Sequence, residues 1–184
     1  MNMDLAKLTI PLPIESIDFR IQSVNKGGYA NILAYKDARV DMQRLDEVCG
    51  PLGWRREHAR DNHNCTVSIW KEVGNDGNGF WVGKEDFGTP SMAEADKGLA
   101  SDSFKRACFN WGIGRELYDY PLIQVKLNEQ EFDKSTGKAT WKLKLREWVW
   151  YSEFYGNKLS FLAAKDEQGS MRYKWGAMKD KANV

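Results

Sequence analysis

The chain has 184 residues, of which 42% are hydrophobic and 29% charged, and its net charge is +1. It is long enough to bury a hydrophobic core, and its near-neutral balance excludes nucleic-acid binding through a general excess of basic charge. The sequence shows neither a signal-peptide pattern nor the roughly 18 apolar residues of a membrane span. We therefore expect a soluble, cytoplasmic protein that does not associate with membranes.

The N-terminal part predicts an arm, a pair of strands and a helix. Residues 1–16 contain two prolines near their end and suit a loosely held arm. Residues 17–24 alternate in a strand-like way, and a Gly-Gly turn separates them from a second strand at 29–35. Asp37 then begins a helical pattern that ends at Cys49-Gly50-Pro51.

A hairpin and a second helix follow. Residues 65–73 and 80–87 predict two strands, which a glycine-rich connection joins into a hairpin. Ser91 and Glu94 form a capping box, so we expect a helix from about residue 92 to about residue 110.

The C-terminal part is predicted to be rich in strands. Segments 122–127, 139–150, 158–164 and 171–175 each read as a strand between glycine-containing turns. The whole order predicts an α+β fold, in which a small antiparallel sheet or hairpin packs on helices and a β-rich extension follows.

The three cysteines and two histidines do not indicate a disulfide or a metal site. Cys49, Cys65 and Cys108 are odd in number, far apart and outside any CxxC pair, so we expect reduced, mostly buried thiols. His58, His63 and Cys65 form at most a partial metal site, because no fourth ligand follows at a usual spacing. The sequence therefore predicts no metal.

Enzyme motifs are incomplete as well. Gly83-Lys84 resembles the end of a P-loop, but Glu85 stands where Ser or Thr would hold magnesium. Asp37, Asp41, Glu85 and Asp86 can be paired on paper as nuclease carboxylates, although surface acids at this density are expected. We therefore expect a protein without an enzymatic reaction and without a nucleotide cofactor.

The helix at 92–110 carries a polar stripe. Lys97, Ser101 and Lys105 are four residues apart and share one face, and Arg106 points about 100° away from Lys105. Such a stripe suits contacts to a phosphate backbone, but it also suits a solvated helix face, and the spacing alone does not decide between them.

An aromatic and a glycine turn end this helix. Trp111 is either a core residue or a platform for a stacked base, and Gly112 is expected to allow a close backbone approach. Arg115 follows the turn and adds a further cation to the same end of the helix.

Three blocks in a fixed order resemble the Rad52-type single-strand annealing proteins, with the phage-encoded branch as the nearest likeness. These blocks are YKDARVDMQRLDEVCGPLGW at 35–54, the hairpin, and GLASDSFKRACFNWGIGRELYDYP at 98–121. The likeness covers residues 17–121, which predicts an arm at 1–16, an annealing core at 17–121 and a separate extension at 122–184.

The resemblance implies an ATP-independent protein that forms rings or open helical arcs, holds single-stranded DNA and pairs complementary strands in recombination and repair. A host single-stranded-DNA-binding protein or a phage exonuclease is a further expected partner. The K-R-A motif maps onto Lys105 and Arg106, and the hydroxyl one turn earlier maps onto Ser101. The complete set of candidate DNA-binding residues is Lys105, Arg106, Ser101, Lys97, Arg20, Arg39 and Arg115.

The chain departs from the family at two points. Phe109 stands where the animal members have a further arginine, which weakens or reshapes the expected inner site. Residues 126–184 do not resemble the tail of the eukaryotic members that binds a recombinase, so we do not expect a mediator role.

Two alternatives stay open. One is a nucleic-acid-binding module without annealing activity that uses the β-rich C-terminal half. The other is a metal-dependent nuclease built on the acidic residues of the hairpin.

Overall fold

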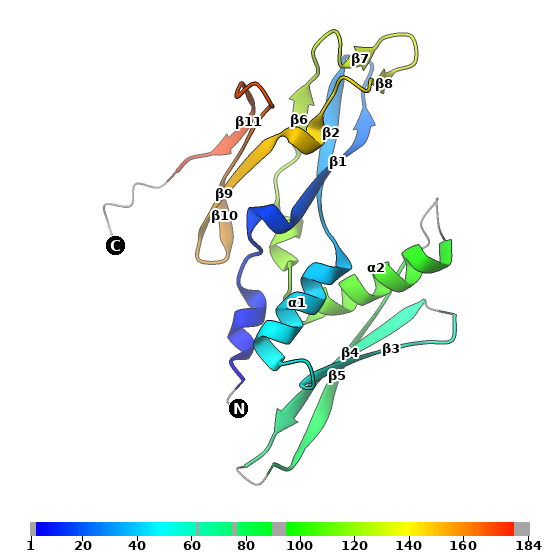
Figure 1. The fold of residues 1–184 in the computed structure, drawn as a ribbon, viewed down its shortest axis with the longest axis vertical. Helices are drawn as coiled ribbons and strands as arrows, with labels where there is room; N and C mark the ends of the chain where they lie inside the picture. The colour runs from blue at the N-terminus through cyan, green and yellow to red at the C-terminus, as the bar shows by residue number, and fades with distance from the viewer. Residues whose placement is uncertain (1–2, 62, 75–76, 90–94, 179–184) are drawn as a thin grey trace. The chain divides into compact units, whose positions relative to one another are not determined.

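The fold is α+β, and the residues that the structure describes form four small antiparallel sheets and two α-helices (Figure 1). It is known from a computed structural model, which describes residues 3–61, 63–74, 77–89 and 95–178. The expected capping box at Ser91 and Glu94 lies outside these residues.

The chain forms two compact units, and each consists of two separate stretches of sequence. The first unit contains Met1–Pro11 and Asp37–Arg115, and the second contains Leu12–Lys36 and Glu116–Val184. These boundaries differ from the arm, core and extension expected from the sequence, and that division stays a prediction.

The first unit is a three-stranded sheet with helices packed on it. Strands β3 (Trp54–His58), β4 (Asn64–Glu72) and β5 (Gly79–Phe87) pair antiparallel in this order. The helix α2 (Ala95–Asn110) lies against β4 and β5, and α1 (Ala38–Cys49) lies beside α2 (Figure 1). The hairpin and the second helix are therefore confirmed.

The core of the first unit lies between α2 and the sheet. Phe104 and Cys108 of α2, Val67 of β4 and Leu45 of α1 are fully buried, and Ile69 is 2% exposed. Burying a large apolar side chain contributes about 1.5–3 kcal/mol, so these contacts fix the position of α2 on the sheet.

Local signals define both ends of α1. The Asp37 carboxylate accepts a hydrogen bond from the backbone N–H of Arg39 at 2.8 Å, which satisfies one free donor of the first turn. Gly50 ends the helix with a positive φ of 73°, and its N–H donates to the carbonyl of Asp46. The predicted limits of this helix are confirmed.

The N-terminal segment is packed and not loosely held, which corrects the expectation. Its residues Leu5–Thr9 form a 3-10 helix in which Leu8 is 1% exposed. Arg44 of α1 donates to the carbonyls of Lys7 and Ile10 at 3.0 and 2.7 Å. The arginine therefore ties this segment to α1.

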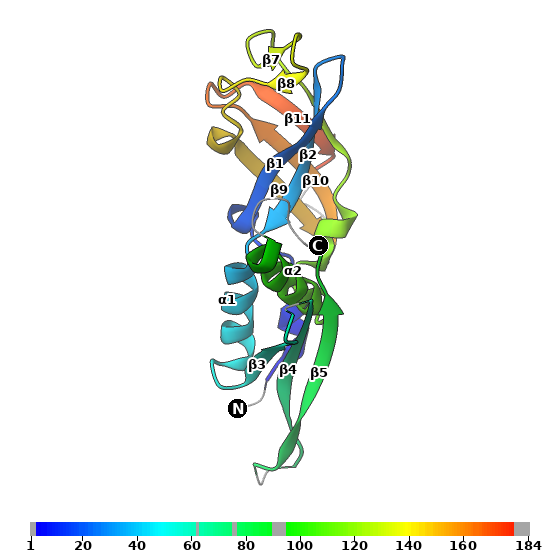
Figure 2. The same ribbon diagram turned by 90° about the vertical axis from the view of Figure 1, so that its right-hand side faces the viewer.

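The second unit contains two three-stranded sheets. In the first, β1 (Ile17–Val24) pairs antiparallel with β2 (Tyr29–Lys36), beside which it lies in Figure 2. The strand β2 also pairs antiparallel with β6 (Ile123–Lys126). The register places Ile21 opposite Ile32 and Ile32 opposite Ile123. The strand pair predicted from the alternating pattern is confirmed.

The other sheet is formed by the C-terminal strands. Its order is β9 (Val149–Tyr155), β10 (Lys158–Lys165) and β11 (Met171–Gly176), with β10 in the centre. A short hairpin of β7 (Phe132–Asp133) and β8 (Lys138–Ala139) precedes it. The predicted strands after residue 157 are confirmed.

Aromatic rings and a buried ion cluster hold the second unit together. Phe19 of β1 stacks on Trp150 of β9, with ring centroids 3.6 Å apart and an interplanar angle of 5°. Arg172 of β11 contacts Glu131 at 2.7 Å and Asp166 at 3.4 Å, and all three side chains are nearly buried. Hydrogen bonds from Arg172 lower the pKa of Glu131 despite its burial, so this carboxylate stays charged.

Two predictions about strands are wrong. The alternating segment 139–150 is not one strand, because Thr140 and the residues after it form a turn and Leu145–Glu147 forms a 3-10 helix before β9 begins. The strand β3 was missed, since its polar sequence lacks apolar alternation and it pairs along only one edge, to β4.

We predict that Gly112→Ala lowers the free energy of unfolding by about 2 kcal/mol, because Gly112 has a φ of 96° and an added Cβ would lie 2.7 Å from Cγ2 of Thr9. Urea unfolding measures this. Gly50→Ala is the control, since Gly50 also has a positive φ but no atom within 4 Å of an added Cβ.

A double-mutant cycle with Thr9→Ala separates the two causes. The double variant should regain the stability that Gly112→Ala loses through the steric clash. It should not regain the stability lost through the strained backbone at residue 112. An equal destabilisation of Gly112→Ala and Gly50→Ala would mean that the close approach to Thr9 is unimportant.

Candidate nucleic-acid interface

Four of the seven candidate residues lie on α2. Lys97, Ser101 and Lys105 occupy positions i, i+4 and i+8 of this helix, as the sequence predicts, and Arg106 follows one residue later. Ser101, Lys105 and Arg106 are half-exposed. The side chains that face away from the core therefore include the two predicted phosphate-binding cations.

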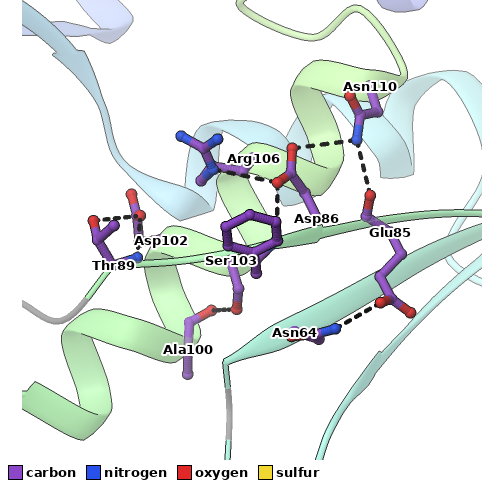
Figure 3. Close-up of polar contacts among 10 residues, drawn as sticks. Asn64, Glu85, Asp86, Thr89, Ala100, Asp102, Ser103, Arg106 and Asn110 are labelled. Atoms are coloured by element: carbon purple, nitrogen blue, oxygen red, sulfur yellow. Dashed lines mark hydrogen bonds and ion pairs between the residues drawn. The ribbon is translucent and has the colours of Figure 1, made fainter.

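Arg106 is positioned by an acid on the neighbouring strand. Its Nε lies 3.4 Å from Oδ1 of Asp86 on β5, and its side chain keeps 39% of its surface exposed (Figure 3). Asn110 donates to Oδ2 of Asp86 at 3.3 Å and to the backbone carbonyl of Glu85 at 3.0 Å. A half-exposed guanidinium with one carboxylate partner retains N–H donors for a further anion.

The charge of Lys105 acts on Asp37, the residue that caps α1. The pKa of Asp37 is lowered, first by the hydrogen bond from the backbone N–H of Arg39 and further by the positive charges of Arg39 and Lys105. The Arg39 side chain is 88% exposed, and its Nε lies 3.2 Å from Oδ1 of Asp37. Arg39 of α1 thus pairs with Asp37, and the charge of Lys105 on α2 also acts on this acid.

Two cations neutralise the C-terminal end of α2. Nη2 of Arg115 donates to the carbonyl of Phe109 at 2.7 Å, and Nζ of Lys84 donates to the carbonyl of Asn110 at 2.7 Å. Positive charge at this end is favourable because the last carbonyls carry partial negative charge. Arg115 therefore has a structural task, and its exposed side chain also places a guanidinium beside the backbone of Phe109.

Trp111 is packed in the first unit. Its Nε1 donates to the carbonyl of Val67 at 2.9 Å, and the ammonium of Lys84 lies 4.5 Å from its ring centroid. One face of the ring is thus covered by a cation of the same chain. Of the two interpretations left open by the sequence, the structure favours the core residue over an open stacking platform.

Arg20 lies in the second unit, on the same face of its sheet as Tyr35. Its Nε donates to Asp18 at 2.6 Å, and its guanidinium lies 5.5 Å from the ring centroid of Tyr35. At the other end of β2, the ring centroid of Tyr29 lies 4.5 Å from Nζ of Lys126 on β6. Arg20 thus belongs to an exposed sheet face of the second unit that carries two cation–aromatic pairs.

Residues on β3 and β5 that support α2 are not among the candidates predicted from the sequence. Arg56 lies 5.0 Å from the ring centroid of Phe104, and Lys84 and Asp86 contact α2 as described above. A signal was present, because alternate residues of a strand share one face, so Lys84 and Asp86 both had to face the partner of β5. The sequence did not show that this partner is α2.

The carboxylates proposed for a nuclease do not gather. Glu85 and Asp86 are neighbours on β5 and point to opposite faces, where Glu85 accepts from Asn64 at 2.6 Å and Asp86 contacts Arg106. Asp41 is fully buried. In the part of the chain that the structure describes, three or more His, Cys, Asp or Glu side chains do not gather as a metal site would require.

Comparison with known proteins bears on residues of both units. A model of the family described as "Rad52/22 family double-strand break repair protein" matches residues 4–136. The chain belongs to this family. The matched Rad52/22 segment includes α1, the β3–β4–β5 sheet, all of α2 and the sheet that contains Arg20. The resemblance read from the sequence is therefore confirmed at the level of the family.

Two bacterial relatives carry the name "Single-stranded DNA-binding protein DdrA". The protein of Deinococcus radiodurans is 36% identical over 121 residues, which are 62% of this chain and 54% of that protein. The protein of Deinococcus deserti is 32% identical over 128 residues, which are 67% of this chain and 60% of that protein. The chain thus matches little more than half of each relative's length.

We predict that Asp86→Asn raises the affinity for single-stranded DNA by up to about fivefold, because Asp86 and a phosphate group compete for Arg106 and an exposed ion pair is worth up to about 1 kcal/mol. Fluorescence anisotropy with a labelled oligo-dT measures the change. Glu85→Gln is the matched control, since it removes the same charge from the opposite face of β5. An equal rise in both variants would indicate only a general charge effect.

Proposed function

We propose that this protein binds single-stranded DNA and anneals complementary strands without a nucleotide cofactor, in homologous recombination and double-strand break repair. The observation that carries the proposal is the pair Lys105 and Arg106, half-exposed on α2 within the segment that matches the Rad52/22 family. The names of the DdrA relatives support the DNA-binding part.

The chemistry of the interface fits a ligand of any sequence. Lysine and arginine bind phosphate oxygens, which carry no sequence information, and an annealing protein must accept every sequence. Base edges left free on a held backbone can pair with a second strand. Pairing releases about 1.4 kcal/mol per stacked step, so annealing needs neither ATP nor covalent catalysis.

We further propose that the active form is a homo-oligomer, either a ring or a helical arc. One chain offers only a few cations near α2 and has a net charge of +1. Repeating these cations along one continuous strand multiplies the number of bound phosphates, and the affinity rises with that number. A few cations per subunit are then sufficient.

A second candidate is single-stranded-DNA binding without annealing. It is favoured by the name of both relatives, which states binding alone. The sequence alternative places such binding on the β-rich C-terminal half, whereas the first candidate uses α2, and in either case the assay must measure pairing as well as binding.

The setting of the protein belongs to the same proposal. Action in the cytoplasm of a bacterial host, a phage origin, and cooperation with a host single-stranded-DNA-binding protein or a phage exonuclease follow from the resemblance. Among the helices that the structure describes, none is long and apolar enough to cross a membrane.

We predict that Lys105→Ala/Arg106→Ala lowers the affinity for oligo-dT at least about tenfold, because two phosphate-binding cations are removed from each subunit. The slope of log K against log[salt] should become shallower by about 0.7 for each cation removed. ATP-free pairing of two complementary fluorescent oligonucleotides should be accelerated by the wild-type protein and not by this variant.

The matched control is Arg55→Ala/Lys71→Ala. It removes two positive charges from the same sheet, with Arg55 on β3 beside Trp81 and Lys71 near the far end of β4. Binding and annealing should be retained in this control. If the α2 variant binds and anneals like wild type, the assignment of the site is wrong; if wild type binds without accelerating pairing, the second candidate is correct.

A further inference from the structure

A solvent-exposed tryptophan lies beyond the segment that matches the family. Trp141 is 83% exposed, whereas Trp175 is 38% exposed and the other six tryptophans are half-buried or buried. The family match ends at residue 136. The indole is therefore a feature that the proposed site on α2 does not use.

The loop that presents this indole is anchored on both sides. We call residues 140–146 the Trp141 loop. The N–H of Thr140 donates to the carbonyl of Glu131 at 2.8 Å, and its hydroxyl donates to the carbonyl of Gln130 at 2.6 Å. At the other end of the loop, Leu145 is 9% exposed. Because these interactions already hold the backbone, binding through Trp141 would cost little conformational freedom.

Basic residues outnumber acidic ones in the sequence around Trp141. Residues 134–152 contain five basic residues and one acidic residue, Glu147, and this range is flanked by Asp133 and Glu153. Glu147 lies 3.4 Å from Nζ of Lys144, and both side chains are about half exposed. The exposed cations of the loop and of the strand before it are Lys138, Lys142, Lys144 and Arg146.

This combination favours a nucleic acid over a protein as the occupant. The centres of protein–protein interfaces are depleted in lysine, whereas sites for single-stranded nucleic acid combine cations that follow the backbone with aromatic rings on which bases stack. We infer that the Trp141 loop is a second binding site for single-stranded DNA, in which the indole stacks on a base and the neighbouring lysines contact phosphates. The inference rests on the proposed function, and it extends the DNA-binding surface to the C-terminal part of the chain.

The test is the affinity of the full-length protein for fluorescein-labelled oligo-dT. Trp141→Ala should weaken binding about fivefold or more, since a stacked base contributes substantially to such affinities. Trp141→Phe should restore most of the affinity, because a phenyl ring also stacks. Trp175→Ala is the matched control that removes an indole from β11 and should bind like wild type. Equal thermal melting of all variants shows that the fold is intact.

A second readout follows the indole itself. The emission of Trp141, taken as the difference between wild type and Trp141→Ala, should be quenched when oligo-dT saturates the protein. An unchanged affinity of Trp141→Ala together with an unquenched difference signal overturns the inference. So does a change in oligomer mass with unchanged affinity, because the indole would then lie between subunits.

The Lys105→Ala/Arg106→Ala variant distinguishes a failure of the Trp141 site from a failure of the proposed function. If that variant no longer binds DNA while Trp141→Ala still does so like wild type, the proposed function stands and the Trp141 loop is no DNA site. If the wild-type protein does not bind oligo-dT, both proposals fail together.

Discussion

The packing of α2 on the β3–β4–β5 sheet is the interaction on which the candidate interface depends. Phe104 and Cys108 are completely buried on one side of the helix, and this burial forces Lys105 and Arg106 to the side that remains accessible. The strand below supplies Asp86 to hold Arg106 and Lys84 to cap the helix end. The apolar core thus determines the direction of the cations, and the sheet restricts their movement.

Restraint by a nearby acid has a cost and a benefit for such a site. Asp86 and Asp37 weaken the local positive potential around α2, and this would lower the affinity of the proposed interface for phosphate. They also reduce the conformational entropy that the long side chains would give up on binding. For the proposed annealing function, moderate interactions repeated many times along a strand would be an advantage, since each can break separately.

The sequence was sufficient to predict elements whose ends carry local signals. It was insufficient where the structure of a segment depends on the element that it pairs with. Asp37 caps the start of α1 and Gly50 its end, and both signals are local, so the limits of this helix were predictable. The strand β3 is polar, and only its pairing with β4 identifies it as a strand. The segment 139–150 alternates like a strand, but hydrogen bonds of Thr140 hold its beginning in a turn. For the site, the K-R-A motif identified Lys105 and Arg106, but Asp86 required knowledge of which strand lies under α2.

The division of the chain into two interleaved units has a consequence for the order of folding. Ile32 of β2 pairs with Ile123 of β6, so the sheet of the second unit cannot be completed until the ribosome has made all of the first unit. Closing so long a loop costs entropy and slows folding. Early folding of residues 37–115 would shorten the effective loop, because a folded insert holds its two ends at a fixed separation. Until β6 is made, the edge of β2 that pairs with it is unpaired, and unpaired strand edges favour aggregation.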